Sequence, residues 1–191
     1  SEICDARFSK CCGGISEDFE NVWQNQLRPY LTSIQDSASE NLVANNSFFR
    51  TSPPAFCNTT DPKILNQILV DFDRETHNFY RWKVIFKNEK LTALLKKKSD
   101  IDFGEIIDIV PLERGKSGRI IRLEIIGTKR TVIVGKELEI RKWFSESHLY
   151  SAAFTVEKHV DNNSNIPSQF TLYGAGWGHG VGMCQIGAAV M

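Results

Sequence analysis

The sequence carries no net charge and contains no long apolar run. Lys and Arg together number 23, and so do Asp and Glu, so the formal charge is zero. Because no overall positive field exists to attract nucleic acid, we expect no nucleic-acid partner. No apolar stretch approaches the ~20 residues of a membrane-spanning helix, so we expect no membrane span in this stretch.

Cysteine is scarce and odd in number, with five residues at Cys4, Cys11, Cys12, Cys57 and Cys184. An odd count prevents a complete set of intrachain disulfides, and no CxxC pair is present. Three of the five lie close together, so Cys4, Cys11 and Cys12 are candidate zinc ligands, with Cys57 or a histidine completing a tetrahedral shell. Buried thiols and a Cys4–Cys11 disulfide are the alternatives. Cys184 lies far away in the sequence, and we expect it to be packed rather than reactive.

The length and composition are those of one globular domain. The chain has 191 residues, of which 41% are hydrophobic and 24% are charged, values that argue against disorder. We therefore expect residues 1–191 to form a single domain. Both ends look cut, because the first residues enter an alternating pattern at once and residues 187–191 resemble an unfinished helix. We expect the sequence to be an excerpt that is truncated at both ends.

The hydrophobic periodicity predicts an α+β fold. Period-two alternation predicts a half-buried strand over 79–86, with Tyr80, Trp82, Val84 and Phe86 on one face. Further strands are expected at 2–8, 105–112, 119–126, 131–134, 152–158 and 170–173, and helices near 16–23, 61–72, 91–98 and 135–144. Because strands follow one another through tight turns, we expect a mostly antiparallel sheet or a barrel-like core with short peripheral helices.

Glycine occupies every second position from 174 to 182. If this segment is extended, one face has no side chains and the other displays Trp177 and His179. If it is a loop, the glycines permit positive φ and leave amides free to bind an anion or a developing oxyanion. Either form exposes a tryptophan that can stack on sugars and a histidine that can carry protons. The structural alternative is a glycine-rich strand packed on another strand, with His179 as a hydrogen-bonded core residue.

The glycine segment carries a family resemblance. Residues 176–183 read Gly-Trp-Gly-His-Gly-Val-Gly-Met, followed by Gln185, and residues 5–14 read Asp-Ala-Arg-Phe-Ser-Lys-Cys-Cys-Gly-Gly. Together with the Arg-Gly-Lys-Ser-Gly-Arg turn at 114–119, they resemble the stage II sporulation protein D / amidase-enhancer family over nearly the whole chain. The resemblance implies an exported bacterial protein of the cell envelope or periplasm. Its sporulation members are lytic transglycosylases that cleave peptidoglycan glycan strands, and other members enhance an amidase.

The resemblance also suggests site residues. It implies His179 in the catalytic site, with Trp177, Gly178, Gly180, Gly182 and Gln185 contacting the glycan. Relatives use an upstream glutamate as the acid/base and bind zinc near the first segment through His and Cys, whereas this sequence has Ser9 where many of them have histidine. No segment matching the one with the catalytic glutamate is present, so we expect this stretch alone to be inactive. Three readings follow: part of a lytic transglycosylase, a non-catalytic peptidoglycan-binding module that stimulates an amidase, and a β-rich domain whose glycines are purely structural.

Overall fold

The protein has an α+β architecture with short helices, as the periodicity predicts. The computed structural model describes residues 3–38, 41–69, 78–161 and 164–191. In chain order its elements are β1 (Phe8–Ser9), α1 (Phe19–Val22), α2 (Pro62–Ile68), β2 (Arg81–Lys87), α3 (Asn88–Ser99), β3 (Ile106–Arg114), β4 (Ile120–Gly127), β5 (Thr131–Val134), α4 (Glu137–Trp143), β6 (Phe154–Val160), β7 (Pro167–Ala175), β8 (Met183–Cys184) and α5 (Gln185–Val190).

Two antiparallel sheets of three strands form most of the β-structure. One has the order β2-β7-β6 and the other β3-β4-β5. The tight turn over 115–118 joins β3 to β4, where the sequence predicts it. A third, two-residue pairing is parallel: β1 pairs with β8, which brings opposite ends of the sequence together. The expectation of a mostly antiparallel sheet is confirmed.

The largest apolar core joins the two sheets to α3 and α4. On β2 the buried face carries Trp82, with Val84 and Phe86 packed beside the core, and this is the face that the alternation predicts. Phe154 and Phe170 of the neighbouring strands are fully buried against it. Each such side chain contributes roughly 1.5–3 kcal/mol by leaving water. This core holds the sheets in place and leaves the Arg81–Lys83 face of β2 outside.

The helices begin and end largely where their sequence signals lie. The Asp61 carboxylate accepts a hydrogen bond from the Lys63 amide at 2.8 Å, so α2 begins at Pro62 as predicted. The predicted helix over 61–72 ends at Ile68, and Phe72 lies outside the described residues. The strand predicted over 2–8 is wrong in length, because β1 is only as long as its partner β8.

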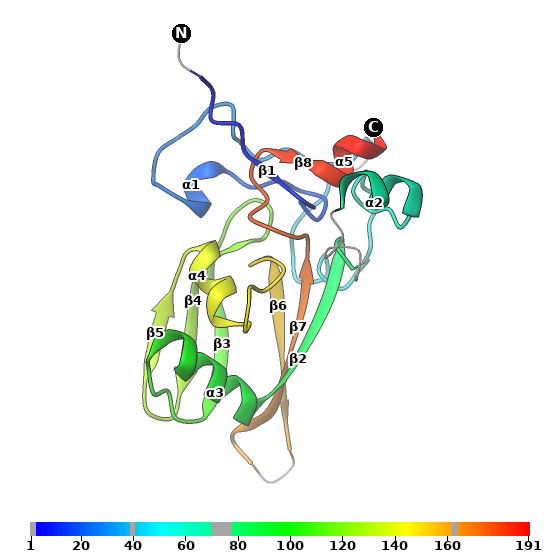
Figure 1. Cartoon of the computed structure of the whole chain (residues 1–191). Coiled ribbons are helices and arrows are strands. Elements are labelled where there is room, and N and C mark those ends of the chain that lie inside the picture. The colour runs from blue at the N-terminus through cyan, green and yellow to red at the C-terminus, as the bar shows by residue number, and fades with distance from the viewer. Residues whose placement is uncertain (1–2, 39–40, 70–77, 162–163) are drawn as a thin grey trace.

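The end of the molecule away from the sheets is built from segments distant in sequence. Figure 1 shows β1, β8, α1, α2 and α5 gathered at this end, where both chain termini also lie. α2 and α5 contact each other there, although they are more than a hundred residues apart in the chain. In the described ranges, none of the helices has the length and apolar character of a membrane span. The candidate site lies where these distant segments meet.

Candidate functional site

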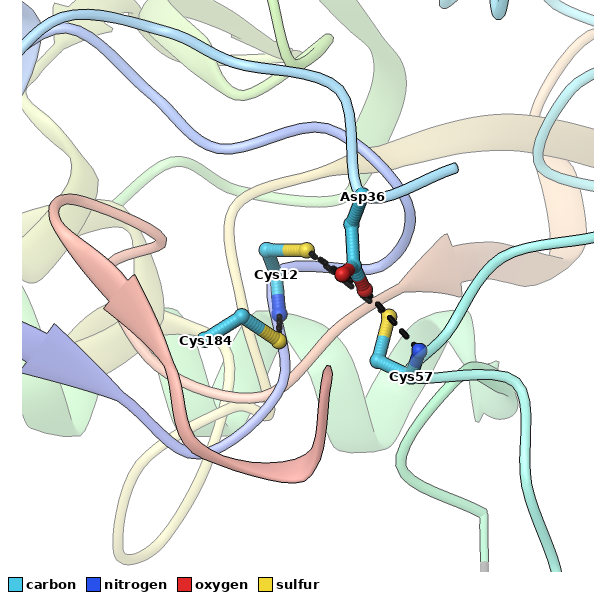
Figure 2. Close-up of side chains that lie close together, drawn as sticks. All are labelled: Cys12, Asp36, Cys57 and Cys184. Atoms are coloured by element: carbon cyan, nitrogen blue, oxygen red, sulfur yellow. Dashed lines mark hydrogen bonds between the residues drawn. The ribbon is translucent and has the colours of Figure 1, made fainter. Parts of the chain in front are cut away.

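Four side chains from four separate segments converge at the end of the molecule opposite the sheets. One ligand atom from each of Cys12, Asp36, Cys57 and Cys184 lies within 4.8 Å of every other. The Cys12 and Cys57 Sγ atoms are 3.7 Å apart, and Cys12 Sγ lies 3.6 Å from Asp36 Oδ2. Figure 2 shows the four side chains pointing toward a common centre. Thiolates and a carboxylate are ordinary ligands of a divalent metal, so this cluster can hold a metal ion.

Hydrogen bonds from backbone amides hold the segments of this cluster together. The Cys57 amide donates to Asp36 Oδ2 at 2.9 Å, and the Cys12 amide donates to Cys184 Sγ at 3.2 Å. The Asp36 amide donates to the Gly14 carbonyl at 2.9 Å, which fixes the loop around Asp36 beside the segment that contains Cys12. Cys184 ends β8 and is the N-cap residue of α5. These hydrogen bonds therefore hold the loop around Asp36, the segment with Cys57 and the end of β8 beside one another.

The surroundings of the cluster perturb its titration. Burial raises the pKa of the Cys57 thiol and of the Asp36 carboxyl. The Cys184 thiol is the exception: hydrogen bonds from the Cys11, Cys12 and Cys57 thiols hold its pKa far below its ordinary value. The thiols of the cluster are therefore coupled, and a negative charge that forms in it is shared through these hydrogen bonds. A bound cation would neutralise that charge.

The structure sorts the predicted zinc ligands into three groups. Cys12 lies in the cluster, and so does Cys57, the residue expected to complete the shell. Cys11 is buried beside it, where its thiol interacts with those of Cys57 and Cys184, whereas Cys4 is exposed and away from the cluster. The Cys4–Cys11 disulfide is not formed, since both thiols are free. Cys184, expected to be packed rather than reactive, packs against this cluster, and β1–β8 pairing brings it to Cys12.

The glycine segment is a loop with alternating backbone conformations. After β7 ends at Ala175, positive φ values recur at Gly176 (77°), Gly178 (93°), Gly180 (78°) and Gly182 (75°). The residues between them carry the side chains. Of the two forms that the sequence left open, the structure adopts the loop.

Other parts of the chain occupy the glycine side of this loop. A Cβ at Gly180 would lie 2.3 Å from Cζ of the buried Arg119, and one at Gly182 would lie 2.1 Å from the Arg7 carbonyl oxygen. Several loop amides donate to protein acceptors, namely those of Gly176, Trp177, Gly178, Val181 and Met183. The expectation that the loop leaves its amides free for an anion is wrong for these five. Close packing of the chain on itself accounts for the glycines.

His179, the predicted catalytic residue, is half-buried and held by two neighbours. Its Nδ1 accepts a hydrogen bond from the Val181 amide at 3.1 Å, and its ring lies 4.6 Å from the Trp23 ring. Burial, together with the positive charges of Arg119 and Arg141, lowers the pKa of His179 to about 4. The imidazole is therefore neutral at pH 7, with the proton on Nε2.

Because the pKa of His179 is lowered in the folded protein, the free energy of unfolding depends on pH. An imidazole in the unfolded chain titrates near 6.5, so between pH 6.5 and 4 the unfolded state binds more protons than the folded state. We therefore expect the free energy of unfolding, measured with urea, to fall as the pH drops through this range. His179→Gln should make the decline shallower because an amide does not titrate. The exposed His148 is the control: a variant His148→Gln that flattens the decline as much would refute the assignment to His179.

Trp177 and Gln185, the predicted glycan contacts on the same segment as His179, have different surroundings. Trp177 is half-buried and lines a hollow of about 370 Å³ with Tyr150 and His148. The Trp177 ring packs 4.8 Å from the Tyr150 ring, so the hollow has an aromatic wall. Gln185 is the first residue of α5 and directly follows Cys184 of the cluster. The glycine segment therefore leads from the aromatic hollow at Trp177 to the Cys/Asp cluster at Cys184.

Two fully buried carboxyl groups were not found from the sequence. Glu17 is fully buried and accepts hydrogen bonds from Ser117 Oγ at 2.5 Å and Asn21 Nδ2 at 2.8 Å. Glu137 is also fully buried, and neither of its oxygens has a hydrogen-bond donor within the described part of the chain. Burial raises the pKa of Glu137, although Arg141 Nη1 lies 3.5 Å away. Glutamates at such positions give no local sequence signal of burial.

Fold and site together define the class of this protein: an α+β domain with a buried Cys/Asp cluster suited to a metal ion. The chain belongs to the family described as "Domain of unknown function (DUF8618)", which matches residues 17–182. That match includes Asp36, Cys57 and His179, whereas Cys12 and Cys184 lie just outside it. No curated protein matches the chain.

Proposed function

We propose that Cys12, Asp36, Cys57 and Cys184 bind one zinc ion. The observation that supports this proposal is the spacing of the four possible ligand atoms. With Zn–S bonds of about 2.3 Å and a Zn–O bond of about 2.0 Å, a tetrahedral site has S···S edges of about 3.8 Å and S···O edges of about 3.5 Å. The edges from Cys12 to Cys57, 3.7 Å, and from Cys12 to Asp36, 3.6 Å, match these values, and all the donor atoms lie within 4.8 Å of one another. Three sulfurs and one oxygen suit zinc better than the all-oxygen metals magnesium and calcium.

The zinc has a structural role in this proposal. Four protein ligands fill a tetrahedral shell and leave no position for a substrate, which is the pattern of structural zinc sites. The ligands come from the first segment, the loop around Asp36, the segment before α2, and β8. When bound, the ion supplies charge neutralisation and a cross-link. Through it the chain holds the glycine segment against the start of the sequence.

We further propose that this chain is the glycan-binding portion of an exported bacterial cell-wall protein that acts on peptidoglycan. The resemblance of residues 176–183 to the sporulation protein D family motif supports this. The hollow beside Trp177 also supports it, because aromatic walls with polar neighbours such as His148 are the usual composition of a sugar site. Among the readings of that resemblance, a lytic transglycosylase requires an acid/base outside this stretch.

The alternative is a non-catalytic module that binds peptidoglycan and enhances an amidase. With a pKa of about 4 and its Nδ1 accepting from the Val181 amide, His179 is a neutral hydrogen-bonding group at pH 7, which is compatible with a role in binding. In this reading His179 fixes the conformation of the loop that presents Trp177, and the partner amidase supplies the chemistry. Both readings place the glycan strand at the aromatic hollow.

Glycan binding is tested with purified glycan strands stripped of stem peptides. The chain should co-sediment with these strands, and Trp177→Ala should weaken binding about tenfold because an aromatic contact of ~1.5 kcal/mol is lost. His148→Ala, at an exposed position on the same hollow, should weaken it without disturbing the fold. Tyr30→Ala removes an exposed aromatic elsewhere and is the matched control. Wild-type binding no stronger than that of an unrelated domain would rule out the glycan proposal and leave the zinc proposal standing.

A further inference from the structure

The outer face of the β2-β7-β6 sheet carries a hollow of about 590 Å³ that neither proposal above uses. The register places Lys83 of β2 directly opposite Tyr173 of β7. Arg81 lies two residues earlier on the same face of β2, and Arg50 reaches the hollow from the loop that precedes α2. Lys83, Tyr173, Arg81 and Arg50 all line it, and we call it the Tyr173 hollow.

Two cations share one aromatic ring in the Tyr173 hollow. Arg50 Cζ lies 4.1 Å from the centre of the Tyr173 ring, and Lys83 Nζ lies 5.2 Å from it. Arg50 is paired with Glu157, which does not line the hollow, and Lys83 has no ion pair within the described residues. No carboxylate is among the described residues that line the hollow. Glu157 neutralises Arg50 and lies within electrostatic reach of Lys83, so the excess positive charge of the hollow comes from Lys83 and Arg81.

Arg81, the third cation that lines the hollow, is held mainly by backbone carbonyls. Arg81 Nε and Nη1 donate to backbone carbonyls of Phe48, Thr51, Gly13 and Tyr80. Arg81 Nη2 is buried and has no partner in the part of the chain that the structure describes. Its Cζ lies 3.9 Å from the centre of the Tyr80 ring and 4.4 Å from the centre of the Phe48 ring, so Arg81 lines the hollow as a cation fixed by aromatic rings and backbone carbonyls.

From these observations we propose that the Tyr173 hollow binds a compact oxyanion, a carboxylate or phosphate group carried by a small ligand. Arginine presents several donors that match the paired oxygens of such groups, and lysine adds a point charge. Tyr173 supplies a flat wall for the body of the ligand. This site is independent of the metal cluster and of the hollow beside Trp177, so it stands whether or not the glycan proposal holds.

Calorimetric titration of the whole chain tests the site with three probes. Inorganic phosphate represents the phosphate source, acetate the carboxylate source, and acetamide is the neutral control, so none of the probes is a sugar. We expect at least one of the two anions to bind, with an affinity that falls as salt rises, and acetamide not to bind. Lys83→Gln should weaken the affinity for the anion about tenfold, since one charged partner is lost.

The matched control is Lys97→Gln, which removes a lysine of the same charge from an exposed ion pair with Glu146 on another face. Arg50→Gln is the second variant and should also weaken binding. Equal thermal unfolding of all three variants would show that they fold. The proposal is overturned if neither anion binds, if acetamide binds as well as the anions, or if Lys83→Gln and Lys97→Gln bind the anion alike.

Discussion

Cys57→Ser is expected to lower the midpoint of thermal unfolding of the zinc-loaded protein by about 10 °C. A ligand at about 1,000 times its dissociation constant stabilises the folded state by about 4 kcal/mol. For a chain of this size, 1 kcal/mol moves the midpoint by roughly 2–4 °C. Serine keeps the shape of the side chain but removes a thiolate ligand, so the bound zinc and its stabilisation should be lost together. Differential scanning calorimetry with and without a chelator measures both.

The matched control for Cys57→Ser is Cys4→Ser. Cys4 is exposed and lies outside the cluster, so the same chemical change there should leave the midpoint and the effect of the chelator as in the wild type. A chelator should destabilise the wild type and Cys4→Ser, and should have little further effect on Cys57→Ser. If both serine variants unfold at the wild-type temperature, the cluster does not hold a stabilising metal.

Gly180→Ala should destabilise the protein by about 3 kcal/mol. The residue has a φ of +78°, where an L side chain is strained by roughly 1–2 kcal/mol. Its new Cβ would also lie 2.3 Å from Cζ of Arg119. That guanidinium is buried and donates to the Cys12 carbonyl, the Gly178 carbonyl and Ser117 Oγ, so it cannot move aside freely. Overpacking of this kind adds about 1–3 kcal/mol.

Gly178→Ala separates backbone strain from crowding. Gly178 also has positive φ, +93°, but the nearest atom to its Cβ would be Ser9 Cβ at 3.4 Å, an ordinary contact. This variant should therefore lose only about 1–2 kcal/mol, the cost of the left-handed conformation. Urea unfolding of both variants gives the comparison. Equal losses would mean that the Arg119 contact does not explain why position 180 is glycine.

Local periodicity was sufficient to predict most of the fold. The alternation that begins at Tyr80 identifies the buried face of β2, and the Asp-Pro pair at 61–62 marks the start of α2. The three lysines at 96–98 mark the end of α3. These signals are local, because a strand face, a cap and a helix end each depend on neighbouring residues. Strand pairing across short turns then follows from chain order.

The metal cluster could be predicted only in part, because it depends on contacts between distant segments. Cys12 and Cys57 were identified as candidates by their residue type. Asp36 lies in a polar loop whose composition gives no sign of burial. It reaches the cluster because its amide donates to the Gly14 carbonyl and its carboxylate accepts from the Cys57 amide. Cys184 reaches the site through the two-residue pairing of β1 with β8, which is too short to predict.

The glycine segment shows a second limit of sequence reasoning. Its repeated glycines suggested an open face for a ligand, whereas the chain fills that face with Arg119 and with the backbone of the first segment. A sequence alone cannot distinguish a glycine that admits a ligand from one that admits another part of the same chain. Ser9, in the place where many relatives of the resembled family carry histidine, is buried in β1 and pairs with Cys184. The thiol of Cys184 and the carboxylate of Asp36 provide alternative donors there.

The central claim is that one zinc ion joins four distant segments through three sulfurs and one oxygen. X-ray absorption at the zinc edge, combined with elemental analysis of the purified chain, tests it most directly. The account predicts one zinc per chain with three sulfur neighbours at about 2.3 Å and one oxygen neighbour at about 2.0 Å. A chain that binds no zinc after refolding in its presence, or whose zinc is bound without three sulfurs, would contradict the account.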